Sequence, residues 1–169
     1  MREPKALFLI SLFLFLGVIL QSTLFEFLKI FGVKPDLCLM LIIYAAIYRG
    51  SLAGMLTGFG AGLLNGFFSQ PFGFHSFIYT VVGYFLGKFE GLISLNSWLI
   101  KIILVFASTI AKGIFTGLGQ LVLGIAGPPF FTYAGYILLE AFYNALLSIP
   151  LFFIFQKISI FKEKKAELS

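Results

Sequence analysis

Long uncharged apolar runs, separated by short polar or charged breaks, form the main pattern of the chain. Residues 6–25 carry no charge, and a helix of about 20 residues is long enough to cross the ~30 Å hydrocarbon core of a bilayer. A second uncharged run over residues 37–48 is shorter, but the basic residues at its two ends can extend their side chains to the two interfaces. We therefore expect a first helix over 6–27 and a second over 35–49.

The middle of the chain is uncharged over residues 50–87, which is too long for one span and sufficient for two. Turn-forming residues around Pro71 and Gly73 divide this stretch, and Gly127-Pro128-Pro129 makes a second break further along. The expected bounds of the remaining helices are 51–68, 74–88, 98–124 and 131–156. The pattern therefore predicts an all-α integral membrane protein with six transmembrane helices.

The distribution of Lys and Arg predicts the orientation of these helices. Six spans place both termini on one side, and nine basic residues lie on that side against two on the other. Cytoplasmic segments of membrane proteins carry such an excess of basic residues. We expect one polytopic membrane domain over residues 1–156, a basic tail over 157–169, and both termini in the cytoplasm.

The amino-acid composition excludes several classes of protein. Hydrophobic residues make up 60% of the chain and charged residues 11%, whereas soluble domains are about 45–50% apolar and about 25% charged. A soluble domain of this length could not bury so much apolar surface. The net charge of +5 belongs mostly to the ends of the apolar runs, so the bilayer is the expected partner and nucleic acid is not.

Glycine recurs at every fourth position through the third expected helix. The run consists of Gly50, Gly54, Gly58, Gly62 and Gly66, and a second run with the same spacing contains Gly83 and Gly87. Small residues let two helix backbones approach closely in lipid, where van der Waals contact then holds them together. Two interpretations stay open: these glycines pack helices of this chain against each other, or they form a groove for a partner's helix.

Three polar residues fall within the last two expected spans. Lys112 lies near the middle of the fifth helix, and Glu140 and Asn144 lie one turn apart on the sixth. A lysine at the centre of a span costs roughly 2.5–3.5 kcal/mol on insertion scales, so it should face the bundle. Counted from the shared loop, Lys112 is about 8 Å deeper than Glu140, a distance that a lysine stem can largely cover. We hypothesise that they are in contact, either as an orienting ion pair or as a polar site for a ligand or partner.

Residues that would support catalysis or metal binding are sparse. The chain has a single His75 and a single Cys38, so it offers neither a disulfide nor a histidine or thiolate metal cluster. It contains no nucleophile elbow, no H-E-x-x-H pair and no phosphate-binding loop. We therefore expect no catalytic residue, no metal and no cofactor.

Several short motifs follow one another in a characteristic order. They are Gln21-Ser22 at the end of the first helix, Lys34-Pro35-Asp36-Leu37, Arg49-Gly50 before the glycine-rich helix, Pro71-Phe72-Gly73, and the closing segment 82–87. In these motifs the chain resembles the MreD family of rod shape-determining proteins over nearly its whole length. Many members have an Asp near the end of the glycine-rich helix, where this chain has Asn65. A role that depends on negative charge is therefore not expected at this position.

The resemblance implies a non-enzymatic scaffold in the complex that builds the lateral peptidoglycan of rod-shaped bacteria. Its expected partner is MreC, a single-span protein with a periplasmic domain. Through MreC the scaffold would connect to MreB, the glycosyltransferase RodA and a class B penicillin-binding protein. The expected location is the bacterial inner membrane. The glycine runs and the Pro35-Asp36 region are the candidate surfaces for a partner helix.

The same family is similar in fold to the substrate-binding membrane subunits of energy-coupling-factor vitamin transporters. Those six-helix proteins capture a small molecule near the outer face and dock on an ATPase module, so a transporter subunit is the alternative function. Small residues in their first helix usually assist that docking. Here residues 7–16 are almost all bulky, which favours the scaffold.

Overall fold

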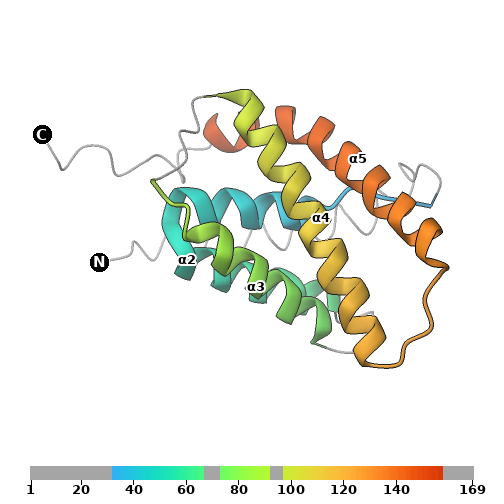
Figure 1. The fold of residues 1–169 in the computed structure, drawn as a ribbon. Coiled ribbons are helices and arrows are strands. Elements are labelled where there is room, and N and C mark those ends of the chain that lie inside the picture. Colours follow the sequence, from blue (N-terminus) through green and yellow to red (C-terminus); the bar gives the residue numbers. More distant parts are fainter. Residues whose placement is uncertain (1–31, 67–72, 92–96, 158–169) are drawn as a thin grey trace, which may run out of the picture.

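The structure, a computed structural model, describes residues 32–66, 73–91 and 97–157. Four helices lie in these ranges: α2 (Leu37–Gly66), α3 (Phe74–Gly87), α4 (Trp98–Val122) and α5 (Phe130–Lys157) (Figure 1). The first expected helix, with Gln21 and Ser22, lies outside the described residues, as does the tail beyond Lys157. The described part is all-α, as the apolar runs predict.

Helix α2 consists of two helical segments that meet at Gly50. This glycine has φ +81° and ψ −176°, a conformation that residues with a side chain rarely adopt. A Cβ atom on Gly54 would lie 2.8 Å from the Cβ of Ala46. In a continuous helix, residues eight positions apart are about 12 Å apart along the axis. The chain therefore turns back on itself at Gly50 (Figure 1), between the second and third helices that the sequence predicts.

Helix α2 begins at Leu37, slightly later than the expected start at residue 35. The physical reason is a side-chain cap, because Asp36 Oδ1 accepts a 2.9 Å hydrogen bond from the backbone N–H of Leu39. An aspartate in this position satisfies one of the amide groups that the first helical turn leaves without a partner. Pro35 consequently precedes the cap instead of occupying the first turn. The other described helix ends differ from the expected ones by less than a turn.

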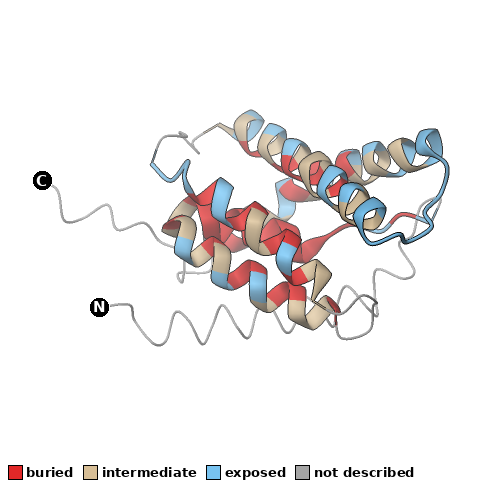
Figure 2. Cartoon of the chain, turned by 60° about the horizontal axis from the view of Figure 1, so that its bottom comes forward, coloured by how far each residue is buried: buried red, intermediate tan, exposed pale blue. Residues whose placement is uncertain are grey.

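The helices form two packed pairs, α2 with α3 and α4 with α5 (Figure 1). Figure 2 shows that buried residues concentrate in α2 and α3, whereas α4 and α5 have exposed outer faces. Leu39, Met40, Ile42 and Ile43 have no exposed surface, so the first segment of α2 forms the centre of the core. The exposed side chains of α4 and α5 are largely apolar, which suits contact with lipid.

Among the described residues, three helices are long and apolar enough to cross a membrane: Leu37–Gly66, Trp98–Val122 and Phe130–Phe155. Helix α3, with 14 residues, is apolar but shorter. The chain is a multi-pass membrane protein. Its polar groups within these helices must then find their partners inside the protein, because the hydrocarbon core offers none.

Candidate functional site

A seam of glycines joins the second segment of α2 to α3. A Cβ atom on Gly54 would lie within 3.0 Å of the carbonyl oxygen of Gly83, and one on Gly58 would lie within 3.0 Å of the carbonyl oxygen of Tyr79. A Cβ on Gly83 would in turn meet the backbone of Gly54. These neighbours are backbone atoms and cannot rotate away, so the close approach of the two helices requires glycine at these positions.

The same seam extends to both ends of the helix pair. A Cβ atom on Gly62 would lie within 3.0 Å of Ser76 Cα, and one on Gly87 would lie within 3.0 Å of Ser51 Cα. Gly66 has only an ordinary contact with Gly73, at 3.8 Å. The groove formed by the α2 glycines is therefore occupied by α3 of the same chain, which favours the first of the two interpretations of the glycine pattern.

A second, looser seam lies between α4 and α5. A Cβ atom on Gly113 would lie 2.7 Å from Ile137, and one on Gly117 would lie 2.8 Å from the ring of Tyr133. Here side chains, not backbone, fill the space. The Tyr133 hydroxyl also donates a 2.8 Å hydrogen bond to the carbonyl oxygen of Gly113, which ties the two helices together.

Lys112 occupies the centre of a network of buried polar side chains. Its ammonium group donates a hydrogen bond to Glu140 Oε1 on α5 and another, of 2.9 Å, to Asp36 Oδ2 at the start of α2. The structure thus brings together Lys112 and Glu140, the contact that we hypothesised from their depths. It adds Asp36, which the sequence associated with a partner surface and not with this lysine.

Asp36 connects more elements than any other member of this network that we describe. Its Oδ1 atom caps α2. Its Oδ2 atom accepts hydrogen bonds from Lys112 and from the hydroxyl of Tyr79 on α3. Its backbone N–H donates a 2.8 Å hydrogen bond to Asn144 Oδ1 on α5. The Asn144 amide then donates to Thr109 Oγ1 on α4, at 3.1 Å. All four described helices therefore meet at this carboxylate or at its immediate neighbours.

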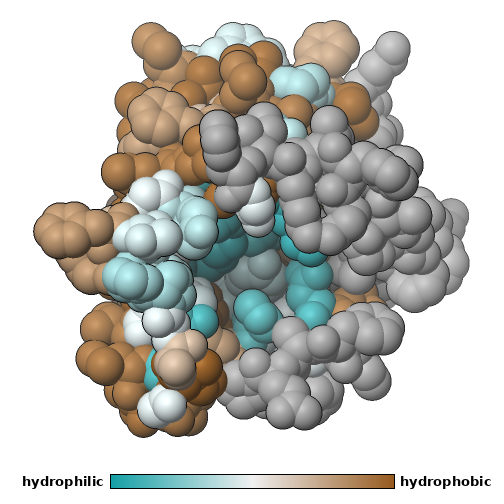
Figure 3. Space-filling model, turned by 90° about the vertical axis from the view of Figure 1, so that its right-hand side faces the viewer, coloured by the Kyte–Doolittle hydropathy of each residue, from teal (hydrophilic) through white to brown (hydrophobic). Residues whose placement is uncertain are grey.

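We call this set the polar network; its members are Asp36, Tyr79, Thr109, Lys112, Glu140 and Asn144. Asn144 and Thr109 have no exposed surface, and the Asp36 side chain is 4% exposed. The side chains of Lys112 and Glu140 are 15% and 19% exposed, so the network opens slightly on one side. Figure 3 shows a hollow lined by hydrophilic residues on the face at the α4–α5 connection.

Sequence reasoning missed three features of the polar network. Tyr79 and Thr109 are ordinary residues of apolar helices, and their partners become apparent only when the helices are packed. Asp36 did provide a signal, because it is an acidic residue next to an apolar span. Elsewhere, Cys38 is buried, as expected of a small apolar residue, and Asn65 is half-buried on α2.

The comparison with family models decides the classification. The model of the rod shape-determining protein MreD matches residues 2–159. The chain belongs to the MreD family. Comparisons with curated proteins and with solved structures gave no match. As a member of the MreD family, the chain has a role in rod shape determination and is a non-enzymatic membrane protein.

Proposed function

We propose that this chain is a membrane scaffold of the bacterial elongation complex. In that role it binds an MreC-like single-span protein and supports lateral peptidoglycan synthesis. Its links to MreB, RodA and a class B penicillin-binding protein are indirect and pass through that partner. The observation that carries the proposal is the family match over residues 2–159.

The geometry of the polar network supports a scaffold because it fixes the two helix pairs relative to each other. Lys112 joins α4 to both α5 and α2, and Tyr79 brings α3 to the same carboxylate. Charged hydrogen bonds of this kind are strong in a low-dielectric interior. The chain can then present fixed surfaces to its partners.

The proposed topology has six spans in one membrane domain over residues 1–156, with both termini on the cytoplasmic side of the inner membrane. The turn at Gly50 supports it, because that turn separates two antiparallel segments within α2. The excess of basic residues on one side supports the orientation. A fold like that of the energy-coupling-factor subunits accords with this arrangement and stays part of the proposal.

The outer faces of α4 and α5 are the surface that we assign to the partner helix. The α2 glycines pack against α3, and Pro35 and Asp36 are buried, which favours packing within the chain over a partner interface for these residues. By contrast, Leu99, Ile103 and Leu146 are 69%, 64% and 68% exposed. A single-span partner could cover such side chains without disturbing the polar network.

Affinity purification from native membranes tests the proposal. The full chain, tagged after Ser169, should recover a single-span protein with a periplasmic domain together with wall-synthesis enzymes. Recovery of an ATPase and a coupling membrane subunit would instead identify a transporter component. Recovery of neither set would refute the scaffold role.

A matched pair of variants tests the assigned surface. Ile103→Trp on α4 should block a docked partner helix, whereas Phe77→Trp on α3 should not, although the two native residues are 64% and 68% exposed. Lipid accommodates either tryptophan, so both variants should fold. Equal recovery of the partner by the two variants would place the docking surface elsewhere.

A further inference from the structure

Helix α3 is shorter than the hydrocarbon core of an ordinary bilayer. It has 14 residues; it begins after Gly73, which has a left-handed φ of +84°, and it ends at Gly87. At 1.5 Å per residue its length is about 21 Å, whereas the hydrocarbon core is about 30 Å thick. A tilt of α3 would reduce the thickness that it covers still further.

Polar groups at both ends of α3 keep its apolar part short. His75 lies in the first turn and is half-buried, and the exposed Lys88 follows the last turn. The Lys88 ammonium group lies 4.7 Å from the centroid of the Tyr84 ring, one turn back along the helix. Because this lysine does not extend away from the helix, its charge stays close to the last turn of α3.

The second segment of α2 has the same limit, because it is packed against α3 along its whole length. At one end of the seam Gly87 lies against Ser51, and at the other end Gly73 lies against Gly66. Residues 51–66 extend over about 24 Å. Backbone contacts along the seam prevent either helix from sliding past the other, so the pair covers about 21–24 Å as one unit.

The outer side of this helix pair is apolar and exposed. Residues 51–66 and 74–87 contain no Asp, Glu, Lys or Arg, so the surface suits the acyl chains of lipids. We call this surface the short face; its main exposed side chains are Leu52, Leu56, Phe59, Phe77 and Phe85.

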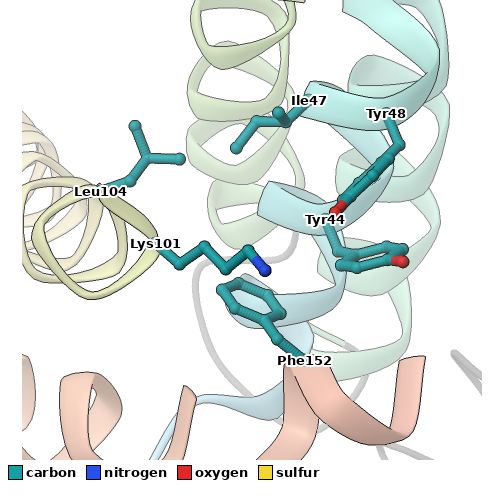
Figure 4. A pocket seen from close by; sticks show the side chains of 6 residues that line it. All are labelled: Tyr44, Ile47, Tyr48, Lys101, Leu104 and Phe152. Atoms are coloured by element: carbon teal, nitrogen blue, oxygen red, sulfur yellow. The ribbon is translucent and has the colours of Figure 1, made fainter. Parts of the chain in front are cut away.

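The α4–α5 pair presents a longer apolar surface. Leu99 and Val122 on α4 are 69% and 83% exposed, and they are about 35 Å apart along the helix axis. Lys101 does not interrupt this surface, because its side chain extends inward toward the rings of Tyr44 and Phe152 (Figure 4). Figure 1 shows that α4 and α5 are both longer than α3.

We propose that the short face selects phospholipids with short acyl chains and thins the bilayer on that side of the protein only. The inference rests on the proposed six-span topology, in which α3 crosses the membrane. An apolar helix that is shorter than the hydrocarbon core is accommodated by thinning of the bilayer around it. Short acyl chains reduce the cost of this thinning, so they accumulate at the short face. The α4–α5 pair is long enough for an ordinary bilayer and has no such preference.

Competition between lipids at a single tryptophan tests the proposal. Trp98→Phe removes the native tryptophan, and a new one is introduced by Phe77→Trp on α3 or by Ile103→Trp on α4, where the native residues are 68% and 64% exposed. The purified full chain is reconstituted with brominated dioleoyl-phosphatidylcholine, which quenches tryptophan at short range. Unbrominated dimyristoleoyl- or dierucoyl-phosphatidylcholine, with shorter or longer chains, then competes with this reference lipid. Recovery of fluorescence measures how well each competitor displaces the reference.

The two positions should give different results. With Phe77→Trp we expect the short lipid to displace the reference about threefold more effectively than the long one. With Ile103→Trp the two competitors should be equally effective, or the long one should be better. Equal competition at Phe77→Trp, or the same preference at both positions, would overturn the proposal. Absence of quenching at Phe77→Trp would show that protein covers the short face and would overturn it as well.

A second position on α3 guards against a local effect of the first. Phe85 lies two turns further along the helix and is 53% exposed, so Phe85→Trp should show the same preference for the short lipid as Phe77→Trp. A preference for the long lipid at Phe85→Trp would refute thinning along the whole face. Because the purified chain is measured without partners, a negative result here leaves the scaffold role to be decided by partner recovery.

Discussion

Replacing Lys112 with methionine should be the most destabilising single change in the polar network. With all three groups ionised, Asp36, Glu140 and Lys112 together carry one net negative charge, and Lys112 contacts both carboxylates. Lys112→Met would leave two carboxylates close together without a cation. Removing one partner of a buried ion pair costs about 3–5 kcal/mol, and we expect Lys112→Met to fall in the upper half of that range.

Glu140→Gln should destabilise the protein much less than Lys112→Met. It would leave Lys112 paired with Asp36 at 2.9 Å, so the remaining pair is neutral overall. The glutamine can still accept a hydrogen bond from the lysine, and its side chain stands in the more exposed part of the network, 19% exposed against 4% for Asp36. We expect a loss of about 1 kcal/mol, the net contribution of an ordinary hydrogen bond, because no unpaired charge is left behind.

The assay is reversible unfolding of the full chain in mixed detergent micelles, followed by far-ultraviolet circular dichroism. The double variant Lys112→Met/Glu140→Gln should be more stable than Lys112→Met alone by about 1–2 kcal/mol, because it removes one of the two unpaired charges. Lys88→Met is the control, because this lysine is exposed and outside the network. The reasoning fails if Glu140→Gln costs as much as Lys112→Met, or if the second substitution restores nothing.

Three further predictions concern the glycines and the topology. Gly58→Leu should lower the free energy of unfolding by about 3 kcal/mol or prevent folding, because backbone atoms of α3 would have to move. Gly135→Leu is the control: a Cβ atom there has no neighbour within 4 Å, so the thermal midpoint should stay unchanged or rise. Gly50→Ala should cost about 1–3 kcal/mol in the same unfolding assay, because its φ of +81° strains any side chain, and an unchanged midpoint would contradict the turn. A reporter fused after Ser169 should be active only in its cytoplasmic form; a periplasmic signal would rule out six spans with the termini inside.

The sequence predicted local features better than contacts between distant segments. Uncharged runs and breaks at Gly50 and Gly73 located the described helix ends, because caps and turns depend on neighbouring residues. The Lys112–Glu140 contact followed from helix depth, since α4 and α5 are consecutive and antiparallel. The link between Asp36 and Asn144 spans 108 positions, and no local pattern specifies it.

The glycine pattern is a second case in which the sequence did not specify a contact between distant segments. The spacing of glycines by four residues predicted that one face of α2 would allow another helix to pack closely. The spacing does not specify which helix packs there. Two candidates, a helix of this chain and a helix of a partner, are equally apolar. The packing of the α2 glycines against α3, for example of Gly58 against the backbone of Tyr79, distinguishes them.

The position of Asp36 has a consequence for how the protein is made. Its carboxylate lies at the start of the first described helix, yet Lys112 and Asn144 are synthesised much later. During translation, the early helices must therefore enter the membrane while this acidic group still lacks the lysine that neutralises it. A nascent chain that ends before α4 therefore still lacks both Lys112 and Asn144 as partners for Asp36. Completion of the chain and neutralisation of Asp36 are thus coupled steps of biogenesis.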